Sequence, residues 1–376
     1  MKKKKSIIFA VYDDLEHEYR GYKTALSLIK CGFDVKIIGV KFSNKKLNGW
    51  DEIPYKRIRL GKKFPLVINM MIFWARLMFI LIRNKAGCFY SHDIFPLLPV
   101  YAASKLTRTP YIYDAHEFWH GNSQLENRPF AKKFWVMYEK AFIRSASRVL
   151  TVSRSIADEL KKIYSLSNVS VFTNLPLKKT VPAKNKRIHS MLRIDNDCRI
   201  VLYQGHFLVN NGLETIVKAF ARVKSKAVLV LAGSGSEKQM LQKLVFDLSL
   251  EQRVFFIGPF PHKELINYTV CADIGLCLIK NHGKSFYYST PNKMFEFIQA
   301  KVPQIASDFP EISSYVKNYG VGIVIDPSDP DLISETIDSM LSDKEQLAVF
   351  KANCEKVSEK LVWEMYEEDL KGLFKL

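Results

Sequence analysis

The feature that most constrains the fold is an alternation of short apolar strand patterns with amphipathic helical patterns, which starts close to the N-terminus. Residues 6–12 read SIIFAVY, residues 19–30 have helical spacing, Gly32 ends that helix, and residues 34–40 read DVKIIGV. A strand, a helix and a second strand in this order form a βαβ unit, whose two strands lie parallel in one sheet. The pattern therefore predicts an α/β fold.

The alternation continues as two series, which indicates two doubly wound domains. The first series ends with a strand pattern at residues 169–173, and the second begins with RIVLYQ at residues 199–204. A chain of 376 residues has room for two domains of about 150 residues each. In such sheets ligands bind where strands end, so we expect the chemistry in loops that follow strands. The expected parts are a first domain (residues 1–178), a basic linker (179–190), a second domain (191–342) and a last helix (343–376) that can cross back to the first domain.

The overall charge favours anionic partners. The net charge is +18, from 56 Lys and Arg residues against 38 Asp and Glu residues, which suits nucleic acid, an acidic membrane surface or a phosphorylated ligand. A hydrophobic content of 48% excludes a mainly disordered chain. The basic N-terminus lacks the apolar length of a signal peptide, and the cysteines form no C-x-x-C pair, so we expect a cytoplasmic protein with reduced cysteines.

One segment raises the question of a membrane. Residues 64–82 read FPLVINMMIFWARLMFILI, interrupted only by Asn69 and Arg76. This run approaches the length that spans a bilayer, but an arginine near the bilayer centre is costly. A buried domain helix and a helix docked on an anionic membrane surface are the other two interpretations, and we expect docking at the inner face of the cell membrane. The basic residues that favour docking are Lys41, Lys45, Lys46, Lys56, Arg57, Arg59, Lys62 and Lys63.

The strongest local motif lies at residues 289–296, which read STPNKMFE. Thr290 is a suitable N-cap and Pro291 suits the first helical position, so the motif predicts a helix N-terminus. The free amides of Asn292 and Lys293 would bind phosphate there, and Lys293 adds a full positive charge. Glu296, one turn further on, is placed to accept hydrogen bonds from a ribose. The same residues are also compatible with ordinary helix capping.

Three other motifs point to weaker hypotheses. Residues 116–120 match H-E-x-x-H, but a strand pattern precedes His116 and Gly121 follows at once, which disfavours the continuous helix of a zinc protease. Residues 195–197 (DND) are better explained as a turn than as a metal site. Residues 233–235 (GSG) follow a strand and suit either a nucleotide contact at Gly233 or a tight turn.

The segment PNKMFEFIQAKVPQIASDFPEI resembles the C-terminal-domain signature of the family 4 (group 1) bacterial glycosyltransferases. Further segments are similar to this family in the same order, among them SHDIFPLLPVYAASKLTRTPYIYDAHEFW, VLYQGHFLVNNGLETIVKAF and RVFFIGPFPHKELINYTVCADIGLCLI. The resemblance covers about residues 6–326. It implies the GT-B fold, in which two Rossmann-like domains with doubly wound parallel sheets face a central cleft.

The resemblance also implies roles for individual residues. His116 matches the histidine that contacts the donor sugar, Glu296 the glutamate that holds the nucleotide ribose, and Lys293 a position at the diphosphate. We therefore expect His116, Lys293 and Glu296 to be the catalytic residues, and Trp119 and His120 to line the acceptor side. The other residues expected at the donor are Gly205, His206, Gly233, Tyr288, Ser289, Thr290, Pro291 and Asn292.

The chain departs from the family pattern at three of these places. Tyr288 stands where the family has its first glutamate, His206 replaces the usual arginine after Gly205, and Asn211 replaces the usual lysine before Gly212. The two missing cations normally balance the leaving diphosphate. These departures favour an alternative, a nucleotide-sugar-binding protein or epimerase of the same fold without transferase activity.

The activity that the resemblance implies is retaining transfer of a sugar from a nucleotide-diphosphate sugar. We expect no metal and no cofactor, because the helix N-terminus supplies charge stabilisation for the leaving group. Membrane docking suggests a lipid-linked saccharide acceptor in surface polysaccharide biosynthesis, of the capsule, O-antigen or lipopolysaccharide type. A nucleic-acid-binding protein is the remaining alternative from the charge, but the basic residues are dispersed and no nucleic-acid-binding motif is present.

Overall fold

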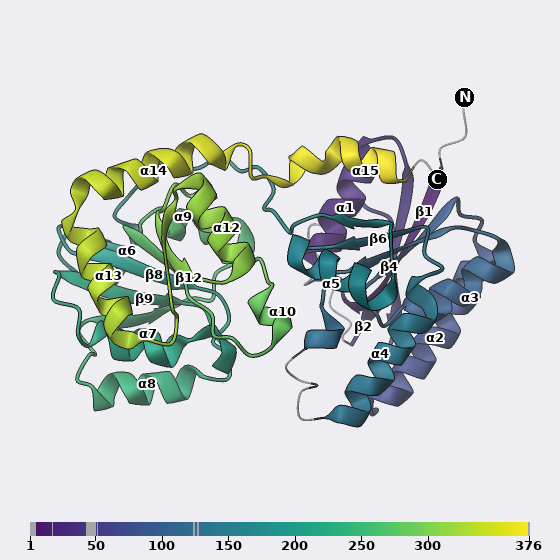
Figure 1. Cartoon of the computed structure of the whole chain (residues 1–376), viewed down its shortest axis with the longest axis horizontal. Coiled ribbons are helices and arrows are strands. Elements are labelled where there is room, and N and C mark those ends of the chain that lie inside the picture. Colours follow the sequence, from purple (N-terminus) through teal and green to yellow (C-terminus); the bar gives the residue numbers. More distant parts are fainter. Residues whose placement is uncertain are drawn as a thin grey trace. The chain divides into compact units, whose positions relative to one another are not determined.

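The computed structural model describes residues 5–16, 18–42, 50, 52–122, 125 and 128–374 (Figure 1). Lys45 and Lys46 of the predicted basic group lie outside these residues. The chain divides into two compact units, of which the first comprises Met1–Asn174 and Trp363–Leu376 and the second Leu175–Val362. The division after Asn174 assigns residues 179–190, the expected linker, to the second unit.

The first unit is built around a parallel sheet. Its seven described strands have the order β3-β2-β1-β4-β5-β6-β7, and Ile7 on the interior strand β1 pairs with Val35 on β2 and Cys88 on β4. Helices flank the sheet (Figure 1), and every residue of β5 is buried, as in sheets covered on both faces. The strands are β1 (Ser6–Asp14), β2 (Asp34–Lys41), β3 (Tyr55–Arg59), β4 (Cys88–His92), β5 (Tyr111–Ala115), β6 (Arg148–Thr151) and β7 (Val169–Val171).

Two helices of the first unit begin where a side chain accepts a hydrogen bond from a free amide of the first turn. Glu18 accepts a hydrogen bond from the amide of Gly21 at the start of α1, and Ser153 caps α5 by accepting one from the amide of Ile156. The helices are α1 (Tyr19–Lys30), α2 (Leu66–Arg83), α3 (Leu97–Thr107), the 3-10 turn η1 (Trp119–Gly121), α4 (Pro129–Ile143), α5 (Arg154–Tyr164), η4 (Trp363–Tyr366) and α15 (Glu367–Leu373).

The second unit has a parallel sheet of its own, with six described strands in the order β10-β9-β8-β11-β12-β13. Its strands are β8 (Arg199–Gln204), β9 (Ala227–Ala232), β10 (Val254–Ile257), β11 (Ile274–Cys277), β12 (Gln304–Ser307) and β13 (Gly322–Ile325). Its helices are α6 (Arg187–Leu192), η3 (Val209–Asn211), α7 (Leu213–Phe220), α8 (Lys238–Asp247), α9 (His262–Thr269), α10 (Lys284–Tyr287), α11 (Asn292–Gln299), α12 (Pro310–Tyr319), α13 (Pro330–Ser342) and α14 (Lys344–Ser358). The predicted α/β class with two doubly wound sheets is confirmed.

Two local features differ from the prediction. The sequence analysis does not identify β3, because this edge strand reads YKRIR and only Ile58 is buried; edge strands are commonly charged. The expected single helix over residues 343–376 is instead α14, a break, η4 and α15. Leu361, Val362 and Trp363 are all buried around the break. Trp363 Nε1 donates to Ser27 Oγ on α1 at 3.1 Å, so contacts within the first unit hold the chain after the break.

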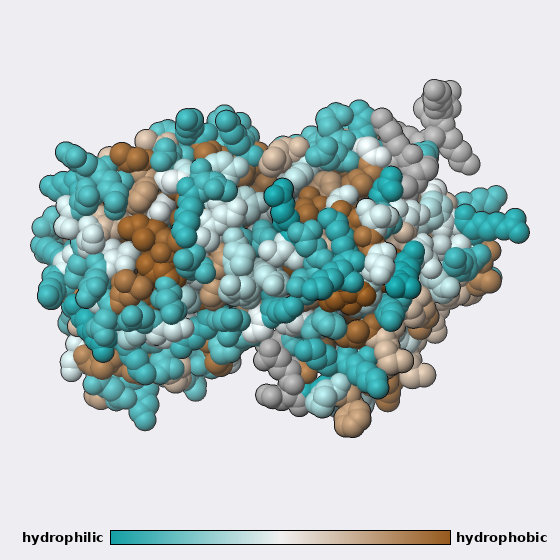
Figure 2. Space-filling model, viewed as in Figure 1, coloured by the Kyte–Doolittle hydropathy of each residue, from teal (hydrophilic) through white to brown (hydrophobic). Residues whose placement is uncertain are grey.

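Helix α2 is the one described helix that is long and apolar enough to cross a membrane. One face packs inside the first unit, where Phe73 and Leu77 are fully buried. One third of its residues are buried, and the outward face keeps large apolar side chains exposed. Figure 2 shows apolar side chains in brown and tan over the region of α2 and α4. The buried-helix interpretation therefore fits only one face of α2.

Candidate functional site

Two glycine loops meet at the carboxyl ends of β8 and β9. Gly205 follows β8 with a φ of +131°, and Gly233 follows β9 with a φ of +155°, conformations that favour glycine. A Cβ at Gly233 would overlap the carbonyl oxygen of Gly205, and a Cβ at Gly235 would overlap the backbone of Phe207. The glycines thus allow the two loops to pack backbone against backbone. This gives Gly233 a structural role, and its contact with a donor stays a prediction.

Helix α11 presents its first turn beside the Gly205 loop. A Cβ at Gly205 would lie 3.9 Å from Lys293 Nζ, and the same ammonium lies 3.9 Å from the centroid of the Tyr203 ring. Lys293 Nζ is buried and has no hydrogen-bond partner among the described residues. Burial of an unpaired ammonium costs free energy, so this arrangement is typical of a group that binds an anion.

The start of α11 corrects one detail of the motif analysis. Pro291, not Thr290, is the N-cap, with φ −62° and ψ +134°, and α11 begins at Asn292. Because the helix starts one residue later than predicted, Thr290 lies one position before the N-cap. The Thr290 hydroxyl is buried and has no hydrogen-bond partner in the described part of the chain. The amides of Asn292 and Lys293 lie in the first turn, as predicted, where helical amides have no intrahelical acceptor.

Glu296 lies one turn into α11, at the end of a chain of hydrogen bonds. Gln204 Nε2, at the end of β8, donates to Glu296 Oε2 at 2.6 Å. The hydroxyl of Thr269 donates in turn to Gln204 Oε1 at 2.8 Å. These contacts fix the Glu296 carboxylate at the carboxyl end of the sheet while its side chain stays partly accessible.

The residues that depart from the family pattern have local structural roles. Asn211 Nδ2 donates to the carbonyl of His206 at 2.7 Å, and the hydroxyl of Tyr203 donates to the same carbonyl at 2.9 Å. Asn211 therefore stabilises the loop after β8 and supplies no charge. Tyr288 ends the short helix α10, and the hydroxyl of Ser289 donates to the carbonyl of Phe286 at 2.8 Å. Positive charge is supplied beside the Gly205 loop by Lys293.

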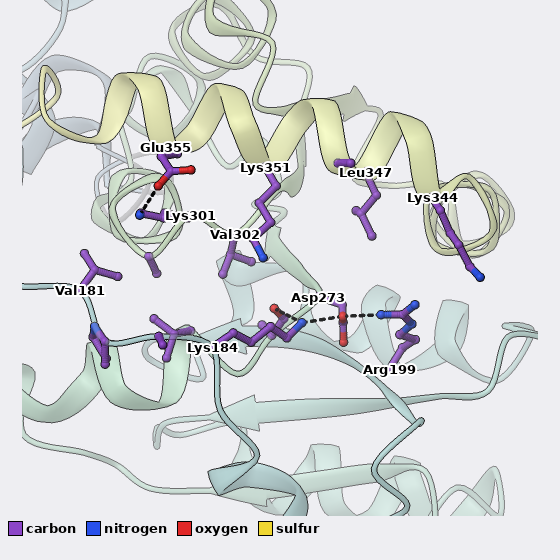
Figure 3. Close-up of a pocket in the computed structure, with 16 residues that line it drawn as sticks. Val181, Lys184, Arg199, Asp273, Lys301, Val302, Lys344, Leu347, Lys351 and Glu355 are labelled. Atoms are coloured by element: carbon purple, nitrogen blue, oxygen red, sulfur yellow. Dashed lines mark hydrogen bonds and ion pairs between the residues drawn. The ribbon is translucent and has the colours of Figure 1, made fainter.

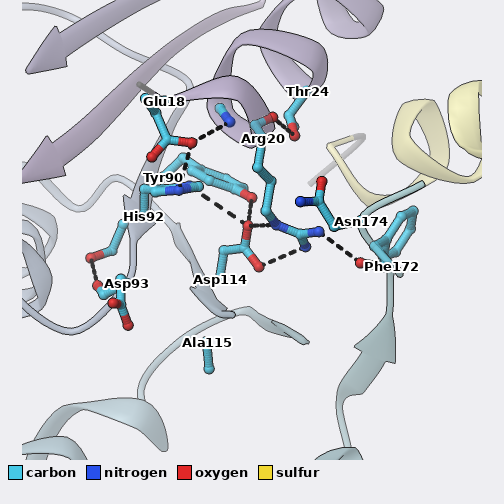
Figure 4. Close-up of polar contacts among 12 residues, drawn as sticks. Glu18, Arg20, Thr24, Tyr90, His92, Asp93, Asp114, Ala115, Phe172 and Asn174 are labelled. Carbon is cyan, nitrogen blue, oxygen red and sulfur yellow. Dashed lines mark hydrogen bonds and ion pairs between the residues drawn. The ribbon is translucent and has the colours of Figure 1, made fainter. Parts of the chain in front are cut away.

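The first unit holds a buried polar cluster at the carboxyl ends of β4 and β5 (Figure 4). Arg20 forms two hydrogen bonds with the carboxylate of Asp114, Nε to Oδ2 at 2.8 Å and Nη2 to Oδ1 at 2.9 Å. Its remaining nitrogen Nη1 donates to the carbonyl of Phe172 at 2.7 Å, and the hydroxyl of Tyr90 donates to Asp114 Oδ2. Although burial opposes ionisation, Arg20 holds the pKa of Asp114 below its usual range.

Two histidines adjoin this cluster. His92 Nε2 lies 3.0 Å from Glu18 Oε1, and the rings of His92 and His116 lie 4.3 Å apart. Burial lowers the pKa of His92, but the Glu18 carboxylate outweighs it and raises that pKa overall. Burial and the neighbouring His92 charge lower the pKa of His116 to about 4. His116 is therefore neutral at neutral pH and able to accept or donate one hydrogen bond at each ring nitrogen.

The same cluster resembles a metal site in composition but not in chemistry. Ligand atoms of His92, Asp114 and His116 lie within 4.8 Å of one another. Both oxygens of Asp114 already accept hydrogen bonds from Arg20, whose fixed positive charge would repel a cation. The H-E-x-x-H motif is not helical either, because His116 follows β5 and His120 lies in η1. The residues of this cluster therefore do not fit a metal ion.

The two residues expected on the acceptor side lie in the turn after β5. Trp119 Nε1 donates to Asp93 Oδ1 at 2.8 Å, and its ring contacts those of Phe95 and Trp135. His120 is half-buried beside Phe118. The structure anchors Trp119 firmly inside the first unit, and its contact with an acceptor stays a prediction.

A cavity of about 830 Å³ in the second unit lies apart from these residues (Figure 3). Its floor is at the amino ends of the strands, where Arg199 begins β8 and Asp273 precedes β11. Lys184 and Arg199 both pair with Asp273 there, at 2.6 and 3.0 Å. Ligands of doubly wound sheets bind at the opposite ends of the strands, so we do not assign the donor to this cavity.

The sequence analysis missed several members of both clusters. Glu18, Arg20, Tyr90 and His92 are absent from the predicted site, as is Gln204 in the second unit. The signal that would have found His92 and Gln204 is their position as the last residues of β4 and β8. These strands flank the point at which strand order reverses in each sheet, where ligands bind.

Comparison with known families matches both units. Residues 21–174 match the family model "Glycosyltransferase Family 4", and residues 184–357 match "Glycosyl transferases group 1". A glycosyltransferase of Methanocaldococcus jannaschii described as uncharacterised is 22% identical over 94% of this chain and 92% of its own. The chitobiosyldiphosphodolichol beta-mannosyltransferase of Candida albicans is 23% identical over 86% of this chain and 77% of its own.

A solved structure supports the fold. The Anabaena protein HepE in complex with UDP-glucose superposes with a TM-score of 0.78 at 15% identity, and the alignment covers 98% of each chain. The alignment includes residues of both units. At this level of identity it concerns the fold.

Proposed function

The chain belongs to the group 1, family 4 glycosyltransferases of GT-B fold, and from this premise we propose that it transfers a sugar, with retention at the anomeric carbon, from a nucleotide-diphosphate sugar to a lipid-linked saccharide. The observation that carries the donor assignment is the buried Lys293 ammonium beside Gly205 at the start of α11. A helix N-terminus and a buried lysine together favour a diphosphate. The UDP-glucose complex of HepE, a protein of the same fold, supports this donor class.

The proposed mechanism is electrostatic. The bond between the anomeric carbon and the diphosphate breaks, the acceptor oxygen bonds to that carbon on the same face, and the acceptor proton passes to the departing phosphate oxygen. Lys293 and the first amides of α11 stabilise the negative charge that grows on the diphosphate, a preorganised arrangement that requires no metal. Glu296 accepts hydrogen bonds from the ribose hydroxyls, and the neutral His116 orients the sugar by hydrogen bonding.

We further propose that the acceptor is carried by a membrane lipid, as in surface polysaccharide biosynthesis, and that the protein works at the cytoplasmic face of a membrane. The exposed apolar face of α2 supports this location. A relative named as a chitobiosyldiphosphodolichol mannosyltransferase supports a saccharide carried on a lipid diphosphate.

A thermal-shift panel of UDP, GDP, ADP and CMP tests the donor site. A ligand at 100 times its Kd adds about 2.7 kcal/mol of stability, so the matching diphosphate should raise the midpoint clearly. No shift with any nucleotide would contradict the proposal. Transfer from the matching nucleotide sugar to a lipid-linked acceptor, unchanged by EDTA, is then expected. Nucleotide binding without any transfer would support the alternative of a binding protein or epimerase.

A further inference from the structure

A second pocket lies in the first unit, between strand β3 and helix α2. It has a volume of about 580 Å³ and follows the carboxyl end of β2, where Lys41 is the last residue. Its walls combine apolar side chains with positive charge. The lining residues are Lys41, Lys56, Arg57, Ile58, Arg59, Ala75, Arg76, Phe79 and Ile80.

The charged side chains that line this pocket are all positive. Five of its lining residues are cations and none is a carboxylate. Arg57 Nη1 lies 3.8 Å from Asp14, and Arg76 Nη1 donates to the backbone carbonyl of Arg59 at 3.0 Å. Within the described ranges no carboxylate pairs with Lys41, Lys56 or Arg59. Clustered cations repel one another, so a pocket that gathers them is suited to an anion with several oxygen acceptors, such as a phosphate.

The pocket opens beside an apolar stripe. Phe79 lines the pocket and is 57% exposed. Exposed residues recur along one side of α2 every three or four positions, at Ile68, Met71, Ala75, Phe79 and Ile82. The polar Asn69 lies on the buried face of α2, where its side chain forms hydrogen bonds with backbone groups of Gly61 and Phe64. The large exposed apolar residues on α2 and just before it, called the exposed row below, are Phe64, Leu66, Val67, Ile68, Met71, Phe79 and Ile82.

The neighbouring helix α4 adds a second exposed row. The rings of Trp74 on α2 and Tyr138 on α4 stack at 6.0 Å, so the two helices are neighbours. Phe130, Phe134 and Met137, spaced four and three positions apart, are 88%, 53% and 61% exposed. Large apolar surfaces of this kind rarely face water in monomeric soluble proteins.

We propose that the β3–α2 pocket binds the phosphate headgroup of an anionic phospholipid while the exposed row of α2 enters the acyl region of the same bilayer. This inference rests on the proposed membrane location and adds a headgroup site to it. The adjacency of the two features carries the inference, because a phospholipid has an anionic head and an apolar tail a few ångströms apart. Apolar burial and attraction of cations to anionic lipid act together in such docking.

Two measurements separate the pocket from general membrane attraction. Flotation with phosphatidylglycerol vesicles measures docking, and we expect binding that is much weaker with phosphatidylcholine vesicles. Thermal shift with dihexanoyl phosphatidylglycerol, below its micelle concentration, measures the headgroup pocket in the absence of a bilayer surface. We expect a clear stabilisation that dihexanoyl phosphatidylcholine does not give. Stabilisation by inorganic phosphate alone, equal to that by the short-chain lipid, would overturn the lipid assignment.

The matched variants are K56Q/R59Q in the pocket and K62Q/K63Q before α2, which remove equal charge from exposed positions. We expect K56Q/R59Q to weaken the affinity for the short-chain lipid roughly 10- to 30-fold, and K62Q/K63Q to change it less than threefold. Equal losses of affinity for the short-chain lipid in both variants would refute the proposed headgroup site. Vesicle binding by the unmodified protein without any short-chain-lipid effect would leave membrane docking standing and refute the headgroup site. No vesicle binding would refute both, while the nucleotide panel would still test the transferase.

Discussion

Arg20 and Asp114, 94 positions apart in the sequence, form a fully buried pair joined by two hydrogen bonds of 2.8 and 2.9 Å. The pair ties the first turn of α1 to the end of β5. His116 follows Asp114 by two residues, so the position of the His116 ring depends on the hydrogen bonds between Arg20 and Asp114. The buried charges of the first unit thus hold the loop from which the predicted sugar contact arises.

Loss of the Asp114 charge should destabilise the protein strongly. Asp114→Asn leaves the Arg20 guanidinium buried without its counter-charge, which costs about 3–5 kcal/mol. Urea unfolding followed by tryptophan fluorescence measures this loss. Asp158→Asn is the control, because its pair with Lys161 at 3.2 Å is exposed and exposed pairs contribute at most about 1 kcal/mol. Similar small losses in both variants would contradict a structural role for the buried pair.

The pKa of His92 predicts how stability depends on pH. The pKa is raised in the folded protein by Glu18, against the effect of burial. Protonated His92 therefore contributes stability that is fully present below about pH 6.5, the ordinary histidine pKa, and is lost as pH rises through the higher folded value. We expect His92→Gln and Glu18→Gln each to flatten this decline in midpoint temperature as pH rises above about 6.5. A slope equal to that of the unmodified protein would contradict the assignment.

The backbone contact between the two glycine loops predicts a strong effect of a small substitution. Gly233→Ala places a Cβ on the carbonyl of Gly205 at a φ of +155°, so the loops must separate. Strain of this kind costs on the order of 1–3 kcal/mol, and the loop after β8 should lose its shape. Gly372→Ala is the control, since a Cβ there meets nothing within 4 Å. Nucleotide affinity and midpoint temperature should fall in Gly233→Ala. In Gly372→Ala, inside α15, the affinity should stay unchanged and the midpoint temperature should stay level or rise, because alanine favours a helix over glycine.

The sequence predicts the fold well because the signals of the fold are local. The strand YIYDA and the helix at residues 19–30 follow from apolar spacing, and the structure has them as β5 and α1. β3 escapes prediction because its burial depends on Ile58 alone. For this strand the position at the sheet edge, which is a tertiary property, overrides the local pattern.

For the candidate site, too, the sequence predicts the local features and misses the contacts between distant residues. Lys293 and Glu296 could be predicted because a helix N-terminus is a local feature that carries its own chemistry. The partners of these residues are distant in sequence: Gln204 lies 92 positions from Glu296, and Arg20 lies 94 positions from Asp114. Only the strand order brings such residues together, so pairwise contacts of this kind are not visible in a single sequence.

Glu296 should matter for the ribose and little for the fold. Glu296→Gln preserves size but replaces a charged acceptor with an amide, and hydrogen bonds to charged groups contribute about 1.5–3 kcal/mol. We expect the Kd for the matching nucleoside diphosphate to rise about 10- to 100-fold. The matching 2′,3′-dideoxynucleotide, which lacks the ribose hydroxyls, should bind both proteins equally. A variant that still prefers the ribonucleotide by the same ratio would rule out the ribose contact.

Lys293 gives the most direct test of charge stabilisation at the donor. Its ammonium is buried beside Gly205 without a hydrogen-bond partner among the described residues, so Lys293→Ala removes a desolvated charge and should not destabilise the free protein. Binding of a nucleoside diphosphate should weaken about 10- to 100-fold, as expected for loss of a charge-assisted contact. Binding of the nucleoside without phosphates should be unchanged, because the lysine faces the diphosphate. Lys243→Ala, on exposed α8, is the matched control. Calorimetry with both ligands separates these outcomes, and equal affinity of Lys293→Ala and the unmodified protein for the diphosphate would refute the proposed role of α11.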